Sequence, residues 1–407
     1  MNESVLINAT YFRNRLSELG LKQWWVADQI GVDRKTVSRW LQGQVRSAQI
    51  DNVRRLCEVL ACQLNDVVLG NEADSFATVE DQKTAANIML NSSLIEKLGA
   101  IGEWDAIEGL LRSCLIPSLS KITLCDLYNQ LTIALWRQSK IDDAQEFCQK
   151  AEALSRSQGD WQLLGTALLS KANILCWKGR NKAAIETYRE VLDLKNYISR
   201  SDYGSALSNL GALLYEVGDL KRGLEYLDDA LECFVLEDKI MSQSINWWHK
   251  SYIYLQMGLL SQSLDSLKHS RELAEKSDYR RGLCACDLLQ AELLSKCGDV
   301  KESKQMLTKA MTGYQNLKIE EGLNYEFAGR INRENCDYQE SLASIDRGIA
   351  ISQDFPLCLA NLHFERAQTL RSLSAQTNEI DRHLNLARDL YLQSDAPLRA
   401  ASCDHKV

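Results

Sequence analysis

The chain repeats itself over most of its length. In each unit a glycine or small residue is followed five positions later by a second small residue and nine positions later by an apolar one. Clear copies begin at Gly179, Gly218, Gly258 and Gly298, and weaker copies begin near Ile101, Ser139, Cys336 and Ala375. Successive starts lie 38 to 40 residues apart. So small a drift predicts an array of stacked structural units.

The spacing inside each unit predicts a pair of helices. The glycine ends the first helix, the small residue lets the second helix approach it, and the apolar residue packs against the next unit. Only three of the 407 residues are proline, and proline interrupts helix interiors. We therefore predict an all-α chain with more than one domain, of which the larger part is an α-solenoid.

These units resemble tetratricopeptide repeats, although each is longer than the ~34-residue consensus. HEAT and armadillo repeats have periods of ~40 to 47 residues, so the period alone leaves those families open. The glycine and small-residue spacing favours the tetratricopeptide family, but the closing proline of that family is missing. We predict a repeat domain of about eight helix pairs over residues 84–395, followed by a C-terminal tail over 396–407.

Residues 23–42 have a different pattern, with apolar side chains at helical spacing around Gly31. Glycine supplies the left-handed conformation that a tight turn between two helices requires. Asp33 is a good N-cap for a second helix that starts at Arg34. The outward face of that helix is basic, which suits a helix lying in the major groove of DNA.

This stretch resembles the helix-turn-helix of Cro and repressor-type regulators, often called the xenobiotic response element family. The resemblance implies a DNA-binding domain over residues 1–70, joined by a polar linker over 71–83. It also implies that Gln23 contacts a phosphate, that the second helix reads bases, and that Arg46 contacts the DNA backbone. The implied base-reading residues are Arg34, Lys35, Thr36, Ser38 and Arg39.

The charge is divided unevenly along the chain. The formal net charge is −8, but residues 1–70 carry nine basic and seven acidic groups, a net of +2. The remaining 337 residues therefore carry a net of −10. This asymmetry predicts that the N-terminal segment contacts a polyanion and that the acidic array binds something else.

Tetratricopeptide superhelices bind partners with the inner face of each first helix. The corresponding positions here carry asparagine, whose amide can hold a peptide backbone, and aromatic or basic side chains that can anchor a ligand. Aromatic residues at this spacing can also be repeat core. The predicted peptide-binding residues are Asn129, Trp136, Arg137, Asn173, Trp177, Ser208, Tyr215, Trp248, Tyr252, Gln256 and Arg330.

The combination of a repressor-like head and a tetratricopeptide array resembles the cytoplasmic, peptide-responsive regulators of bacterial quorum sensing. That resemblance implies a homodimeric transcription regulator that binds a double-stranded DNA operator and whose array binds a signalling peptide. The alternative is a regulator or scaffold whose array binds a partner protein. We expect no membrane segment, cofactor or metal, and no enzyme, since no spacing of the five histidines or other nucleophiles forms a catalytic motif.

Overall fold

The computed structural model describes residues 4–42, 47–63, 67–69, 79–91, 93–116 and 119–404. The chain divides into two compact units, Met1–Ala85 and Ala86–Val407. Both are dominated by helices, and in the described part of the chain no helix is long and apolar enough to cross a membrane. The all-α prediction is confirmed for both units, although the first unit also contains a small β-sheet.

Within its described residues, the first unit packs four helices, α1 to α4, against three short antiparallel strands. The sheet has the order β2-β1-β3, with Val5 opposite Ala48 and Leu6 opposite Leu69. Strands of two to four residues carry too little alternation to be recognised in the sequence. The elements are β1 (Ser4–Ile7), α1 (Ala9–Glu18), α2 (Gln23–Ile30), α3 (Arg34–Leu41), β2 (Ser47–Gln49), α4 (Ile50–Leu60) and β3 (Val68–Leu69).

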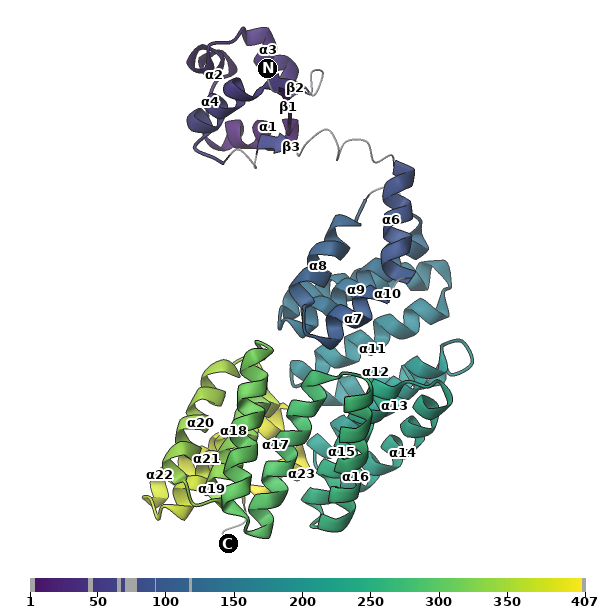
Figure 1. Ribbon diagram of the computed structural model, residues 1–407, viewed down its shortest axis with the longest axis vertical. Helices are drawn as coiled ribbons and strands as arrows, with labels where there is room; N and C mark the ends of the chain where they lie inside the picture. The colour runs from purple at the N-terminus through teal and green to yellow at the C-terminus, as the bar shows by residue number, and fades with distance from the viewer. Residues whose placement is uncertain are drawn as a thin grey trace. The chain divides into compact units, whose positions relative to one another are not determined.

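The second unit is a helical array in which the helices follow one another as antiparallel neighbours (Figure 1). Its helices are α6 (Val79–Asn91, which begins in the first unit), α7 (Leu94–Ala100), α8 (Trp104–Ser113), α9 (Lys121–Arg137), α10 (Ile141–Gln158), α11 (Trp161–Trp177), α12 (Asn181–Asp193), α13 (Arg200–Glu216), α14 (Leu220–Leu236), α15 (Ile240–Gln256), α16 (Leu260–Lys276), α17 (Arg280–Cys297), α18 (Val300–Asn316), α19 (Gly322–Glu334), α20 (Tyr338–Ile351), α21 (Pro356–Ser372), α22 (Thr377–Gln393) and α23 (Pro397–Ser402).

The turns inside the helix pairs explain the repeat in the sequence. Each contains one residue with a positive φ, and these residues fall at or beside the eight predicted starts of the pattern. They are Gly102, Ser139, Gly179, Gly218, Gly258, Gly298, Cys336 and Ser374. Left-handed residues after the second helices, such as Asp238 at φ 50° and Asp278 at φ 49°, end those helices without proline.

The small residue of each unit lies where two helices touch. A Cβ added to Gly223 would approach the carbonyl oxygen of Gly211 to 3.0 Å, so α13 and α14 are close enough there to exclude a side chain. At the equivalent position of a later pair, the buried hydroxyl of Ser303 donates to the carbonyl of Ala291 at 2.8 Å. The small residue therefore permits close packing and, as serine, also fastens the second helix to the first.

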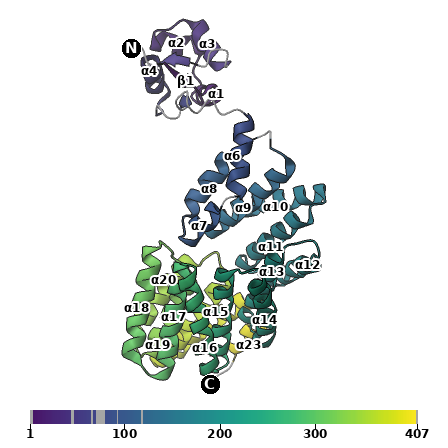
Figure 2. The ribbon, with the colours of Figure 1, turned by 45° about the vertical axis from the view of Figure 1, so that its right-hand side comes forward.

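The end of the array packs against its middle. Residues of α21, α22 and α23 share one hydrophobic core with residues of α11, α12 and α13. Asn181 Nδ2 donates to the carbonyl of Ser394 at 2.7 Å, and the backbone N–H of Lys182 donates to Asp395 at 3.1 Å. The superhelix thus closes on itself after about five helix pairs, with α23 beside α13 (Figure 2).

Residues expected to form a C-terminal tail take part in this closure. From α23, Arg399 Nε donates to the carbonyl of Glu216 at 3.0 Å, and Arg399 Nη2 donates to the carbonyl of Tyr215 at 3.1 Å. These carbonyls belong to the last turn of α13, where a cation is favoured by the helix dipole. Leu398 packs beside Gly218 in the following turn.

Replacing Arg399 with alanine is expected to loosen this closure. Loss of two charge-assisted hydrogen bonds predicts a decrease of about 1–3 kcal/mol in the free energy of unfolding. Hydrogen exchange should accelerate in α23 and in the last turn of α13. Arg388→Ala is the control, because it removes only a solvent-exposed ion pair with Asp404. Equal exchange in the two variants would show that Arg399 does not hold the array closed.

Candidate DNA-binding face and ligand cavity

The turn between α2 and α3 has the geometry expected from the sequence. Gly31 ends α2 in the left-handed conformation at φ 73°. The side chain of Asp33 then accepts a hydrogen bond from the backbone N–H of Lys35 at 2.7 Å and caps α3. Val37 and Trp40 bury one face of α3 in the core of the first unit. That core fixes which face of α3 is presented to solvent.

The solvent face of α3 carries the predicted base-reading residues. Arg34, Lys35 and Arg39 are exposed, whereas Thr36 and Ser38 are half-buried. Gln23 is exposed at the start of α2. Arg46 lies outside the described residues.

Two other basic residues of this unit have structural partners. Arg13 Nη2 donates to the carbonyl of Leu41 at 2.7 Å, and Arg15 Nε donates to the carbonyl of Leu60 at 3.2 Å. Each satisfies a carbonyl at the end of a helix. Exposed positive charge therefore lies on α3, at Arg34, Lys35 and Arg39, and also outside it, at Lys22, Arg54 and Arg55.

The adjacent tryptophans of α2 have different surroundings. Trp25 is half-buried against the core of the unit, whereas Trp24 is 57% exposed. Only Trp25 therefore contributes to the packing of the first unit.

A cavity of about 740 Å³ opens within the array. Pockets of ~300–1,000 Å³ are typical of small-ligand sites. Its wall combines aromatic rings with amide and charged groups from α9, α11, α13, α15, α17, α19, α21 and α23. Of the predicted peptide-binding residues, it includes Trp136, Arg137, Asn173, Trp177, Tyr215, Trp248 and Tyr252.

Asn173 is fixed by its neighbours on the cavity wall. Its Oδ1 accepts hydrogen bonds from the hydroxyl of Tyr188 at 2.6 Å and from Asn209 Nδ2 at 3.0 Å. These two donors orient the amide, so that its NH₂ group remains to donate to a carbonyl oxygen of a ligand. No protein acceptor for that NH₂ group is found in the described part of the chain.

Aromatic side chains form the apolar part of the wall. Trp177 contacts the edges of Trp136 and Phe355, with ring centroids 5.8 and 4.4 Å away. Trp248 stacks on Tyr252 at an interplanar angle of 7°. Large rings of this kind bind apolar side chains with little loss of conformational entropy.

Two donors on the wall have no partner among the described residues. These are Trp136 Nε1 and Asn324 Nδ2, both buried. Next to Trp136, the guanidinium of Arg137 lies 4.5 Å from the centroid of that ring. Arg137 is exposed to the cavity, and desolvation by the surrounding walls, together with Arg281, lowers its pKa to about 10, so it stays charged at neutral pH. Because the two unpartnered donors are buried beneath the surface, Arg137 is the group among these three that presents donors to the cavity.

Four predicted residues do not line the cavity. Asn129 is fully buried and its Nδ2 donates to the carbonyl of Leu163 at 3.2 Å, while Ser208 donates to Asn246 Oδ1 at 2.9 Å. Gln256 is half-buried but lies outside the lining. The fourth residue, Arg330, belongs to a buried ionic cluster.

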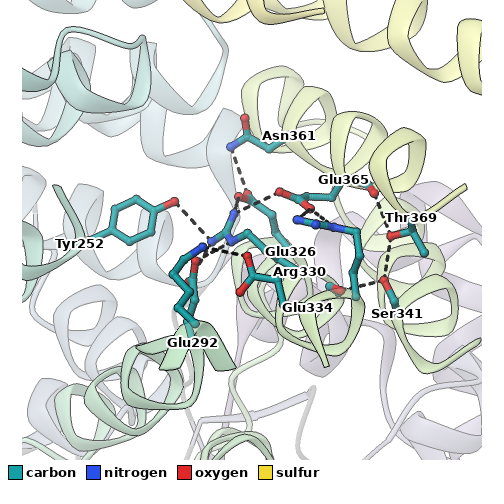
Figure 3. Close-up of polar contacts among 12 residues, drawn as sticks. Tyr252, Glu292, Glu326, Arg330, Glu334, Ser341, Asn361, Glu365 and Thr369 are labelled. Atoms are coloured by element: carbon teal, nitrogen blue, oxygen red, sulfur yellow. Dashed lines mark hydrogen bonds and ion pairs between the residues drawn. The ribbon is translucent and has the colours of Figure 1, made fainter. Parts of the chain in front are cut away.

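Figure 3 shows Arg330 surrounded by carboxylates from three successive first helices. Its guanidinium lies 2.9 Å from Glu292, 3.1 Å from Glu326 and 3.5 Å from Glu365. Burial raises the pKa of Glu292 and of Glu326, and the cation opposes that effect. Because its N–H groups are taken up by these carboxylates and by the hydroxyl of Tyr252, Arg330 has no donor left for a ligand.

Sequence reasoning missed the part of the wall that comes from late in the chain. Asn324, Phe355, Asn361 and Arg399 join the earlier helices only because the superhelix closes. The repeat pattern identifies which positions of each first helix lie on the inner face. It does not show which repeats that are distant in the sequence pack against each other. Their amide and aromatic character was the only signal in the sequence.

The cysteines near the cavity are protected. Burial raises the pKa of Cys176 to about 12, and it raises the pKa of Cys358 still further. Cys284 and Cys286, the closest pair in the sequence, are both buried and burial raises their pKa as well. These four thiols pack as small hydrophobic groups.

Two parts of the chain match known families. Residues 12–68 match the Cro/C1-type HTH DNA-binding domain, and residues 204–234, which form α13 and α14, match the tetratricopeptide repeat. The first unit is thus a Cro/C1-type helix-turn-helix domain, and the array contains tetratricopeptide repeats. No curated protein matches the chain significantly.

Solved structures resemble the chain in fold. A Rap protein complexed with Competence and Sporulation Factor matches with a TM-score of 0.54 at 12% identity, over 79% of this chain and 96% of that one. The APC/C hetero-tetramer Cut9-Hcn1 matches with a TM-score of 0.53 at 12% identity, over 86% and 62%. The apo form of the quorum sensor NprR from B. thuringiensis matches with a TM-score of 0.47 at 14% identity, over 93% and 98%.

Removing charge from α3 is expected to abolish specific DNA binding. Arg39→Ala and Lys35→Ala remove exposed groups without disturbing the core, so thermal unfolding should stay nearly unchanged, while an arginine-to-base pair contributes ~1–3 kcal/mol of discrimination. The measurement is a gel shift with DNA selected by the wild-type protein. Arg347→Ala, which removes an exposed charge from the array, is the control. Wild-type affinity in both α3 variants would contradict the assignment.

Proposed function

We propose that this chain is a sequence-specific transcription regulator whose array binds a short peptide, and that the bound peptide changes how the protein binds DNA. The observation that carries the proposal is the cavity of about 740 Å³ in the array of a chain that also has a Cro/C1-type DNA-binding domain. A regulator needs one site for its operator and a second for its signal, and these two features supply them.

The wall of the cavity suits a peptide better than a purely apolar ligand. Four asparagines line it, namely Asn173, Asn209, Asn324 and Asn361, and an amide side chain carries both a donor and an acceptor. Asn361 is bonded within the protein through both, whereas the NH₂ group of Asn173 has no acceptor among the described residues. A peptide backbone presents the same alternation of donors and acceptors. Trp177 and Trp248 offer rings for its side chains.

The fold is compatible with this role. The Rap protein of similar fold was solved in a complex with Competence and Sporulation Factor. An array whose last helices close on its middle also favours a small effector over a protein partner, because a folded protein does not fit into a cavity of this volume.

Allosteric control follows if the regulator is a homodimer. Paired helix-turn-helix units bind half-sites ~34 Å apart along DNA, so a small change in superhelix curvature alters whether both units can bind together. The ligand acts by binding one arrangement of the array more tightly than another. We place the regulator in the cytoplasm, where operator DNA is accessible.

Peptide binding can be tested through Asn173. We expect a library of short synthetic peptides to contain members that raise the melting temperature of the wild-type protein. Asn173→Ala should lose this stabilisation, because it removes the oriented NH₂ group. Asn316→Ala, an exposed amide at the end of α18, is the matched control and should respond like wild type. A protein that no peptide stabilises, and that co-purifies with a protein partner, would contradict the proposal.

A further inference from the structure

Glu216 stands out among the charged residues of the cavity. It is the last residue of α13, and its side chain lines the cavity. Its carboxylate makes no hydrogen bond or ion pair with any residue that the structure describes. The nearby cation makes no direct ion pair with this carboxylate, because Arg399 donates its hydrogen bonds to the backbone carbonyls of Glu216 and Tyr215.

Several elements surround this carboxylate. Burial and the second acid, Glu326 of α19, together raise the pKa of Glu216 to about 7, against the opposing effect of Arg399 of α23. The other titratable groups that interact with Glu216 are Cys176 of α11, Tyr188 of α12, Tyr215 of α13 and Cys358 of α21.

These other groups leave the charge of Glu216 unmatched. The pKa values of the two thiols and two phenols are all raised by burial, so the groups are neutral at physiological pH. Glu326 is already held by Arg330 at 3.1 Å and by Asn361 Nδ2 at 3.1 Å. An ionised Glu216 therefore faces the cavity with Arg399 nearby but with no cation of the described residues in direct contact.

Glu216 is half-buried on the cavity wall, and a charge-assisted hydrogen bond from a cation stabilises a partly desolvated carboxylate that has no direct partner. An apolar group at this position would increase the desolvation, and an anion would be repelled by Glu216 and Glu326 together. A water molecule can solvate the carboxylate but brings no charge. A ligand group that is positively charged and donates hydrogen bonds therefore fits this region of the cavity wall best.

We propose that the carboxylate of Glu216 is a cation subsite that binds an ammonium or guanidinium group of the ligand. The inference rests on the proposed function, because the subsite is part of the same cavity. For a peptide, the cation is either the N-terminal ammonium or the side chain of lysine or arginine. The subsite also makes binding dependent on pH, since only the ionised carboxylate attracts the cation.

The sign of this dependence is fixed by the raised pKa. Above pH 7 Glu216 is mostly ionised and the subsite attracts cations, whereas below pH 7 it is mostly protonated and the attraction is lost. Between pH 8 and pH 6 the ionised fraction falls by about tenfold, so cation affinity should fall by about tenfold over the same interval. The neighbouring His249 has a pKa lowered to about 4 by burial and stays neutral throughout this range.

The test uses the full-length protein and small cationic probes. Agmatine carries both an ammonium and a guanidinium group, and butylurea is a neutral molecule of similar shape. Calorimetry at pH 8 should show agmatine binding to the wild type and at least tenfold weaker binding to Glu216→Gln. Glu225→Gln, which neutralises an exposed acid on α14, should behave like wild type. Butylamine and butylguanidine then show which of the two cations the subsite prefers.

The pH series provides a second measurement that needs no variant. Wild-type affinity for agmatine should fall by about tenfold from pH 8 to pH 6, and the affinity of Glu216→Gln should not. Agmatine that fails to bind the wild type, binds no better than butylurea, or binds Glu216→Gln equally well with the same pH profile would overturn the subsite.

The outcome is separable from that of the proposed function. Peptides that bind through Asn173 and carry a free ammonium or guanidinium group, with equal affinity for wild type and Glu216→Gln, would overturn the subsite and leave the peptide-responsive regulator intact. Agmatine binding that depends on Glu216, in a protein that no peptide stabilises, would support the subsite and contradict the peptide.

Discussion

The packing of the last helices against the middle of the array is the contact on which the ligand cavity depends. Each helix pair buries its apolar face only by stacking on its neighbours, and such stacking alone produces an open superhelix. Here α21, α22 and α23 share a core with α11, α12 and α13, and Arg399 fastens the last helix to the end of α13. Without this contact, Asn361 and Phe355 would not face the rings of the early repeats.

Much of this architecture could be predicted from the sequence because it is local. The left-handed residue in the turn of each helix pair recurs at a regular spacing that is visible in the sequence. In the DNA-binding unit, Gly31 favours the turn by its conformational freedom and Asp33 favours the helix start by its capping hydrogen bond. The closure is not local, since Asn181 and the residue it contacts, Ser394, are 213 positions apart. No periodic signal encodes which distant repeats meet.

The same lack of information about distant contacts explains why some predicted peptide-binding residues do not line the cavity. A register along each first helix identifies side chains on the inner face, but it does not show how deep that face is buried or what lies opposite. Asn129 is fully buried and bonded to a backbone carbonyl, and Arg330 is matched by three carboxylates. A polar residue on the inner face contacts a ligand only if its side chain reaches the cavity with a donor or acceptor to spare. Arg330 has none to spare, and Asn129, whose Oδ1 has no partner among the described residues, is buried away from the cavity.

The central claim is that ligand occupancy in the array is coupled to operator binding by the helix-turn-helix unit. The most direct test is the operator dissociation constant of the full-length protein, measured by fluorescence anisotropy with and without a saturating peptide ligand. A coupling free energy of ~1–3 kcal/mol, typical of allosteric proteins, predicts a change of about fivefold or more. An identical dissociation constant with the cavity empty and fully occupied would contradict the account.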